Sequence, residues 1–213
     1  MGTVRALMFD FNGTLSHDEP LLLAIYQRLF ARHGKPLTEE QYYARLAGLS
    51  EEAIVGGWLG VDGPLLASLV AERIERYVVA AADGSTVTAP LRDAVRYAAA
   101  RVPVAIVSGA FRAEIEPVVE AADIARELTA IVAADDVERA KPHPDGYLRA
   151  LERLGVKGSE AAAFEDTEAG ISSAKAAGLR CFAVRGTLPD DRLTDADELV
   201  DRIDVALVRR LVG

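Results

Sequence analysis

The sequence has a single cysteine, no long apolar run and a shortage of positive charge. Cys181 cannot form a disulfide within the chain, which favours a reducing compartment, so we expect a cytoplasmic protein. No run of about 18 apolar residues occurs, so we expect neither a membrane-spanning helix nor a membrane partner. The chain has 24 lysines and arginines against 33 aspartates and glutamates. The resulting net charge of −9 argues against nucleic acid as a partner.

The chain is nevertheless rich enough in apolar side chains to bury a core. Half of its 213 residues are hydrophobic, 27% are charged and the mean hydropathy is +0.12, which excludes a disordered chain. This length allows one large domain or a domain with a smaller insert. The start, MGTVRALMFDF, places one basic residue before a short apolar stretch and is not typical of a cleavable signal peptide.

Hydrophobic patterning divides the chain into two kinds of segment. Residues 4–10 form an apolar run that predicts a buried strand. Residues 20–82 have helical patterning with no strand signal, and Thr38 with Gln41 resembles a capping box. After Gly84, predicted strands and helices alternate. We therefore expect a core of residues 1–15 and 84–213, interrupted by an all-helical cap domain of residues 16–83.

The alternating part predicts an α/β fold with a Rossmann-like, doubly wound parallel sheet. The predicted strands of this part are 102–109, 128–135, 161–166 and 180–184. The predicted helices are 91–101, 111–124 with an interruption at Pro117, 144–155, 168–178 and 195–211.

Polar residues collect where the predicted strands end. They are Asp10, Asn12 and Thr14 after the first strand, Ser108 and Gly109 after the second, Lys141 after the third, and Glu165 and Asp166 at the end of the fourth. A single strand-terminal aspartate is more often a cap or a turn residue. In open α/β sheets, however, ligands bind beyond the carboxyl ends of the strands, so four such ends at one edge predict a site.

The acidic residues of this set suit a phosphoryl-transfer site with a metal. A carboxylate such as that of Asp10 can attack phosphorus and form an aspartyl-phosphate, provided that a cation first neutralises the substrate charge. Mg²⁺ prefers carboxylate and carbonyl oxygens. Asp10 and Asp166 are suitable ligands, the backbone carbonyl of Asn12 is a further one, and Glu165 acts either directly or through the other ligands.

The remaining residues of the set suit a phosphate group. The hydroxyl of Ser108, the amide of Gly109 and the ammonium of Lys141 can hold the phosphate oxygens that the metal leaves free. We place Thr14 among the candidate substrate-binding residues as well.

Four motifs of the chain, in order, resemble those of the haloacid dehalogenase superfamily of hydrolases. They are residues 10–14 (DFNGT), the strand VAIVSG with Ser108, residues 141–144 (KPHP) and residues 165–171 (EDTEAGI). Within this family, the chain is similar to the subgroup with a helical cap after the first strand, which includes phosphoglycolate phosphatase and β-phosphoglucomutase. The resemblance covers essentially the whole chain.

The resemblance implies a role for each of the main site residues. Asp10 is then the nucleophile and a Mg²⁺ ligand, and the Asn12 carbonyl and Asp166 are further ligands. Ser108 and Lys141 then bind the phosphoryl group that is transferred. The expected activity is that of a Mg²⁺-dependent phosphatase of a small phosphorylated metabolite.

Asn12 departs from the family pattern. The phosphatases of the family carry a second aspartate at this position, which resembles a general acid and base. An amide cannot exchange a proton near neutral pH, and general acid–base catalysis contributes about 10²–10⁴ in rate, so we expect a slow or specialised phosphatase. His17, Asp18 and Glu19 are candidates to replace the aspartate, although such a polar loop is more often a solvated linker. Three alternatives need no such replacement. The leaving group is good enough to depart unaided, Asn12 deamidates to the aspartate of the family pattern, or Asn12 is an engineered substitution.

Three other functions compete with the phosphatase. The first is that of a mutase, because residues 46–52 resemble a cap loop of β-phosphoglucomutase in which an arginine binds a second phosphate. Here that position is Glu51, which we expect to repel a second phosphate, so mutase function is disfavoured. A phosphonoacetaldehyde hydrolase-like enzyme would need a lysine from the cap, where Lys35 is the only one. A catalytically impaired module that binds or senses a phosphorylated ligand is the third alternative. We expect Tyr42 and Trp58 to pack within the cap.

Overall fold

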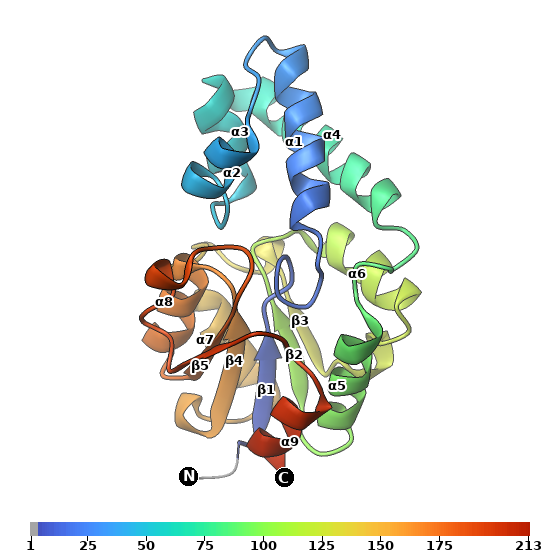
Figure 1. The fold of residues 1–213 in the computed structure, drawn as a ribbon, viewed down its shortest axis with the longest axis vertical. Helices are drawn as coiled ribbons and strands as arrows, with labels where there is room; N and C mark the ends of the chain where they lie inside the picture. The colour runs from blue at the N-terminus through green and yellow to red at the C-terminus, as the bar shows by residue number, and fades with distance from the viewer. Residues whose placement is uncertain (1–3) are drawn as a thin grey trace.

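A six-stranded parallel sheet forms the centre of the computed structural model, which describes residues 4–213 (Figure 1). The strands are β1 (Ala6–Phe9), β2 (Val104–Val107), β3 (Ala130–Val132), β4 (Ala161–Glu165), β5 (Arg180–Val184) and β6 (Glu198–Val200). Their order is β3-β2-β1-β4-β5-β6, and every neighbouring pair is parallel. This is the strand order of a doubly wound α/β fold, so the predicted fold class is confirmed.

Helices occupy two regions of the molecule. The helices α1 (Glu19–Arg32), α2 (Glu39–Arg45), α3 (Glu51–Leu59) and α4 (Gly63–Ala80) follow β1 and lie beyond the carboxyl ends of the strands (Figure 1). We call these four the inserted helices. The sheet itself is flanked by α5 (Ala89–Ala99), α6 (Arg112–Ala121), α7 (Asp145–Leu154), α8 (Glu168–Ala176) and α9 (Val205–Val212). Short 3₁₀ helices lie at Ala125–Glu127, Ala134–Asp136, Gly158–Glu160 and Asp190–Arg192. The division of the chain into two domains at residues 16–83 stays a prediction.

The sheet is buried on both faces, as its apolar strands predict. In β1, Leu7 and Phe9 face the side covered by α5, α6 and α9, whereas Ala6 and Met8 face α7 and α8. All four side chains are fully buried. Burial on both faces explains why the strand sequences are continuously apolar and end abruptly at polar residues.

Two predictions about the helices that flank the sheet are wrong. The segment 195–211 is not one helix, because Glu198–Val200 pairs with β5 as the edge strand β6 and α9 begins only after Asp204. The Asp204 side chain accepts a hydrogen bond from the Leu207 amide at 2.9 Å and caps that shorter helix. Helix α6 runs through Pro117 without interruption, since one proline removes a single backbone hydrogen bond.

The chain enters and leaves the inserted helices at one place. The Ser16 hydroxyl donates to the Thr86 hydroxyl at 2.8 Å, and the His17 amide donates to the Thr86 carbonyl at 2.9 Å. The capping box of Thr38 and Gln41 in α2 is present as predicted. No described helix is long and apolar enough to cross a membrane.

We expect Gly84→Ala to destabilise the protein by about 2–5 kcal/mol. Gly84 has φ +66°, and a Cβ there would lie 2.6 Å from the Ala122 nitrogen at the end of α6, so left-handed strain adds to a backbone clash. The control Gly57→Ala lies in α3 with open space around its Cβ and should stabilise by about 0.5–1 kcal/mol. Urea unfolding of both variants measures the difference, and equal midpoints would contradict the expectation.

Candidate active site

Lys141 joins the ends of three strands. Its Nζ donates to the Asp10 carboxylate at 2.5 Å, to the Glu165 carboxylate at 2.6 Å and to the Val107 carbonyl at 3.0 Å. Burial alone would lower the pKa of Lys141, but the two carboxylates raise it above its usual value. The lysine therefore stays protonated and holds the end of β1 next to the ends of β2 and β4.

Three carboxylates converge beside this lysine. Asp10, Glu165 and Asp166 are buried, and each offers an oxygen within 4.8 Å of the other two. Burial raises the pKa of Asp10 and, to about 7, that of Glu165; burial and the neighbouring negative charges raise the pKa of Asp166 well above its usual value. One oxygen of Glu165 and one of Asp166 are buried with no hydrogen-bond partner among residues 4–213. Because one lysine cannot neutralise three carboxylates, this donor set fits a hard divalent cation such as Mg²⁺.

Two glycines make this convergence possible. A Cβ on Gly13 would lie 1.9 Å from Asp166 Oδ2, and a Cβ on Gly170 would lie 1.8 Å from Glu165 Oε2. Gly13 also has φ +73°, which L side chains rarely adopt. Each of these positions must therefore lack a side chain for the carboxylates to reach their places.

Most of the predicted site residues line one cavity between the sheet and the inserted helices. The core residues that line it include Asp10, Asn12, Ser108, Gly109, Lys141 and Asp166. Glu165 lies behind this wall and reaches the site through Lys141. Thr14 is not among the lining residues: its side chain is fully buried, and its hydroxyl has no hydrogen-bond partner in the described part of the chain. The structure thus does not bring Thr14 to the cavity.

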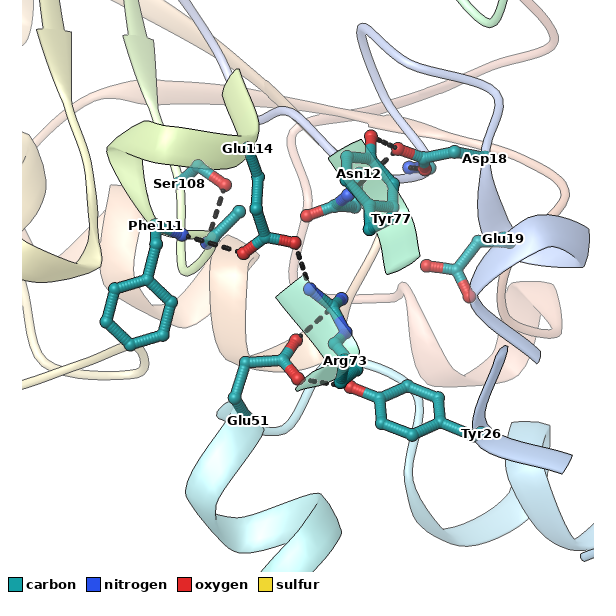
Figure 2. Close-up of polar contacts among 12 residues, drawn as sticks. Asn12, Asp18, Glu19, Tyr26, Glu51, Arg73, Tyr77, Ser108, Phe111 and Glu114 are labelled. Carbon is teal, nitrogen blue, oxygen red and sulfur yellow. Dashed lines mark hydrogen bonds and ion pairs between the residues drawn. The ribbon is translucent and has the colours of Figure 1, made fainter. Parts of the chain in front are cut away.

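The stretch that follows the first motif is not a solvated linker, so that interpretation is wrong for two of its three residues. His17 is exposed, but Asp18 is completely buried. The Asp18 carboxylate accepts hydrogen bonds from the Asn12 side-chain amide at 2.9 Å, from the Gly13 amide at 3.2 Å and from the Tyr77 hydroxyl (Figure 2). Asp18 therefore fixes the orientation of the Asn12 amide.

Glu19, the first residue of α1, also lines the cavity. One of its oxygens accepts a hydrogen bond from the Tyr42 hydroxyl at 2.9 Å. Burial and the negative charges of Asp18 and Asp10 raise the pKa of Glu19 to about 7. Tyr42, expected only to pack, thus helps to form the cavity wall, whereas Trp58 packs on Phe30 as expected.

A buried arginine, which the sequence analysis missed, lines the same cavity. Arg73 of α4 pairs with Glu51 of α3 at 2.8 Å and with Glu114 of α6 (Figure 2). It also lies over the rings of Tyr26 and Tyr77. The signal that could have found Arg73 is its place in the apolar stripe of α4, where an unpaired charge would be costly.

Glu51 lines the cavity but is not a free carboxylate. Its oxygens are held by Arg73 and by the Tyr26 hydroxyl, the latter at 2.5 Å. That Glu51 repels a second phosphate stays a prediction. Arg73 is in turn neutralised by Glu51 and Glu114 and offers no excess positive charge for a second phosphate. Lys35 donates to the Trp58 and Leu59 carbonyls at the end of α3 and is not among the cavity-lining residues, which leaves a Schiff-base lysine unsupported.

Comparison with known proteins identifies the family. The family model described as haloacid dehalogenase-like hydrolase matches residues 4–178. The chain belongs to the haloacid dehalogenase-like hydrolases. This hydrolase is 30% identical to the validoxylamine A 7'-phosphate phosphatase of Streptomyces hygroscopicus subsp. limoneus, over 92% of each chain. It is 34% identical to protein CbbY of Rhodobacter capsulatus, over 83% of each chain. A crystal structure of CbbY from Rhodobacter sphaeroides in complex with phosphate matches with a TM-score of 0.83 and 28% identity, covering 94% of this hydrolase and 95% of that chain.

We expect Mg²⁺ to stabilise this hydrolase, and more strongly as the pH rises. Because the pKa values of Glu165 and Asp166 are raised, the metal-free folded site binds protons that the unfolded chain releases. The free energy of unfolding therefore falls as the pH rises from about 4 to about 7. Mg²⁺ competes with those protons for the carboxylates, so it binds better at the higher pH. At 100 times its Kd, Mg²⁺ should add about 2.7 kcal/mol. Thermal unfolding with and without Mg²⁺ across this range measures the gain. Asp166→Asn should lose most of it, whereas the exposed Asp195→Asn should keep it.

We expect Arg73→Met to destabilise the hydrolase by about 3–5 kcal/mol, because it leaves Glu51 and Glu114 buried without their cation. The matched control, Arg76→Met on the same helix, removes a partly exposed ion pair with Glu72 and should cost no more than about 1 kcal/mol. Equal losses of unfolding free energy in urea would show that the buried pairs do not contribute as their geometry indicates.

Proposed function

We propose that this hydrolase is a Mg²⁺-dependent phosphatase of a small phosphorylated metabolite, acting through an aspartyl-phosphate on Asp10. The observation that carries the proposal is the convergence of Asp10, Glu165 and Asp166 beside the protonated Lys141. Nucleophilic attack on a phosphate monoester requires three things: a carboxylate nucleophile, a cation site and a fixed positive charge. The names of the relatives, a phosphatase among them, and the phosphate bound to CbbY support the same reading.

Each group has a distinct role in the proposed reaction. Asp10 and Asp166, with the Asn12 carbonyl and Glu165, would hold Mg²⁺, which when bound supplies positive charge to the phosphate oxygens. Lys141 holds Oδ1 of Asp10, which leaves the other carboxylate oxygen to attack phosphorus.

Two residues that directly follow β2 complete the proposed phosphate site. Ser108 and Gly109 line the cavity at the start of the turn into α6, where the hydroxyl and backbone N–H groups can hold the oxygens of the transferring phosphoryl group. The Ser108 hydroxyl oxygen accepts a hydrogen bond from the Ala110 amide at 3.0 Å, which fixes its position and leaves its proton free for the phosphate.

The cavity wall indicates the kind of substrate. Tyr26, Tyr42, Glu19 and Glu51 also line the cavity, which has no excess positive charge. The two tyrosine hydroxyls, which donate to Glu51 and Glu19, can still accept hydrogen bonds. This lining suits a small hydroxyl-bearing molecule with one phosphate and disfavours a bisphosphate.

We expect Asp10→Asn to lower Mg²⁺-dependent phosphate release by more than about 10⁴-fold, the scale of losing a covalent nucleophile. The measurement is phosphate release from a panel of sugar monophosphates, and Asp195→Asn serves as the surface control. A wild-type protein that is stabilised by a phosphorylated ligand with Mg²⁺ but releases no phosphate would favour the binding or sensing module instead. Activity that survives in Asp10→Asn would exclude the aspartyl-phosphate.

A further inference from the structure

The proposed phosphatase needs a group that gives a proton to the leaving alcohol and takes one from water. Asn12, at the family's position for that group, can do neither. We infer that Glu19 is the general acid and base of this site. The inference rests on the proposed function and deepens it by naming a catalytic residue.

Glu19 is selected because its competitors are occupied. Among the described residues, the carboxylates that line the cavity are those of Asp10, Glu19, Glu51 and Asp166. Asp10 is the proposed nucleophile and Asp166 belongs to the cation site, while both oxygens of Glu51 are held by Arg73 and Tyr26. In Glu19, only Oε2 has a hydrogen-bond donor within residues 4–213, so its other oxygen is available to a substrate.

Asp18, the other buried carboxylate near Asn12, is unsuited to this role. It is fully buried, it is not among the cavity-lining residues, and both of its oxygens accept hydrogen bonds. His17 is exposed and does not line the cavity either.

The position of Glu19 matches the direction of the reaction. A nucleophile attacks phosphorus opposite the leaving oxygen. Asp10 directly follows β1, whereas Glu19 is the first residue of α1, one of the inserted helices that lie beyond the carboxyl ends of the strands (Figure 1). The leaving oxygen, and later the attacking water, would thus lie on the side of Glu19. Figure 2 shows the Glu19 carboxylate turned towards the space between Asn12 and Arg73.

Asn12 then serves as a positioning residue. Its Nδ2 donates to Asp18, so its carbonyl oxygen points away from Asp18 and can accept a hydrogen bond from water or from the leaving alcohol. An amide held in this way orients the proton that Glu19 transfers.

In the proposed reaction, Glu19 gives up one proton in the first step and regains one in the second. An Asp10 oxygen forms a bond to phosphorus while the bond from phosphorus to the ester oxygen breaks, and protonated Glu19 gives its proton to that oxygen, releasing the alcohol. The Glu19 carboxylate then takes a proton from water as the water oxygen attacks phosphorus. The bond from phosphorus to Asp10 breaks, phosphate leaves and Glu19 is protonated again. A pKa of about 7 suits a group that must work in both forms near neutral pH.

The test uses two phosphoryl donors with Mg²⁺ present: glucose 6-phosphate, whose alkoxide leaves poorly, and acetyl phosphate, whose carboxylate leaves unaided. Glu19→Gln should lower kcat for glucose 6-phosphate by about 10²–10⁴-fold. With acetyl phosphate, Asp10 should still be phosphorylated but its hydrolysis should be slow, so the phosphorylated protein accumulates and is seen by intact-mass spectrometry. A residue that only binds substrate would raise KM without this accumulation.

Restoring a carboxyl group should reverse the defect. The double exchange Asn12→Asp with Asp18→Asn swaps an amide and a carboxylate while keeping their hydrogen bond, and adding it to Glu19→Gln should recover at least about 10-fold in kcat. Glu19→Ala, with room for a small carboxylate, should be rescued by formate. Glu52 is an exposed glutamate on α3, next to Glu51 in the sequence. Glu52→Gln is therefore the matched control and should keep wild-type rates.

Two results separate this inference from the proposed function. If the wild-type protein is active, two outcomes overturn the role of Glu19 alone. In the first, Glu19→Gln and Glu19→Ala keep the wild-type kcat. In the second, both variants lose activity, but the phosphorylated protein does not accumulate and formate does not rescue. A wild-type protein with no Mg²⁺-dependent phosphate release from either donor overturns both. Retention of the Mg²⁺ thermal shift by Glu19→Gln shows that the variant is folded.

Discussion

The structure is organised around an imbalance of charge: three buried carboxylates meet one lysine at the carboxyl edge of the sheet. Each carboxylate lies at or directly after the end of β1 or β4, and Lys141 donates to Asp10, Glu165 and the Val107 carbonyl together. Such an arrangement is unfavourable for folding until a cation or protons compensate it. Close packing at Gly13 and Gly170 and a sheet buried on both faces hold it in place. The site is therefore maintained at a cost in stability, as sites that change charge during reaction often are.

A second buried charge arrangement lines the same cavity. Arg73 joins two of the inserted helices to α6 through Glu51 and Glu114, and Tyr77 joins α4 to the turn that holds Asn12. The same contacts that fix the inserted helices over the sheet thus also define the cavity wall. In the proposed phosphatase, substrate specificity and the stability of the contacts between the inserted helices and α6 would therefore depend on the same side chains.

Much of this molecule was predictable because the signals were local. Apolar runs predict the buried strands, and the polar residues that end them predict the edge at which Asp10, Ser108, Lys141 and Asp166 meet. The edge strand β6 was missed because its apolar residues also fit a helix, and only pairing with β5 decides between them. The sequence offered Glu19 only as one of three candidates and gave the partners of Arg73 no signal, because Tyr42, Glu51 and Glu114 come from other helices along the chain. Thr14, adjacent to the site in sequence, is turned away by the tight turn at Gly13.

The contact between Asn12 and Asp18 has a consequence for how such a sequence can change over generations. If residue 12 became aspartate while Asp18 remained, two carboxylates would lie at hydrogen-bond distance in a buried turn, and one would have to keep a proton. If Asp18 were lost first, the amides of Asn12 and Gly13 and the Tyr77 hydroxyl would lose their shared acceptor. Either single replacement is disfavoured, so the two positions are expected to change together. Once a sequence carries both Asn12 and Asp18, the hydrogen bonds of this one turn therefore disfavour the loss of either residue alone.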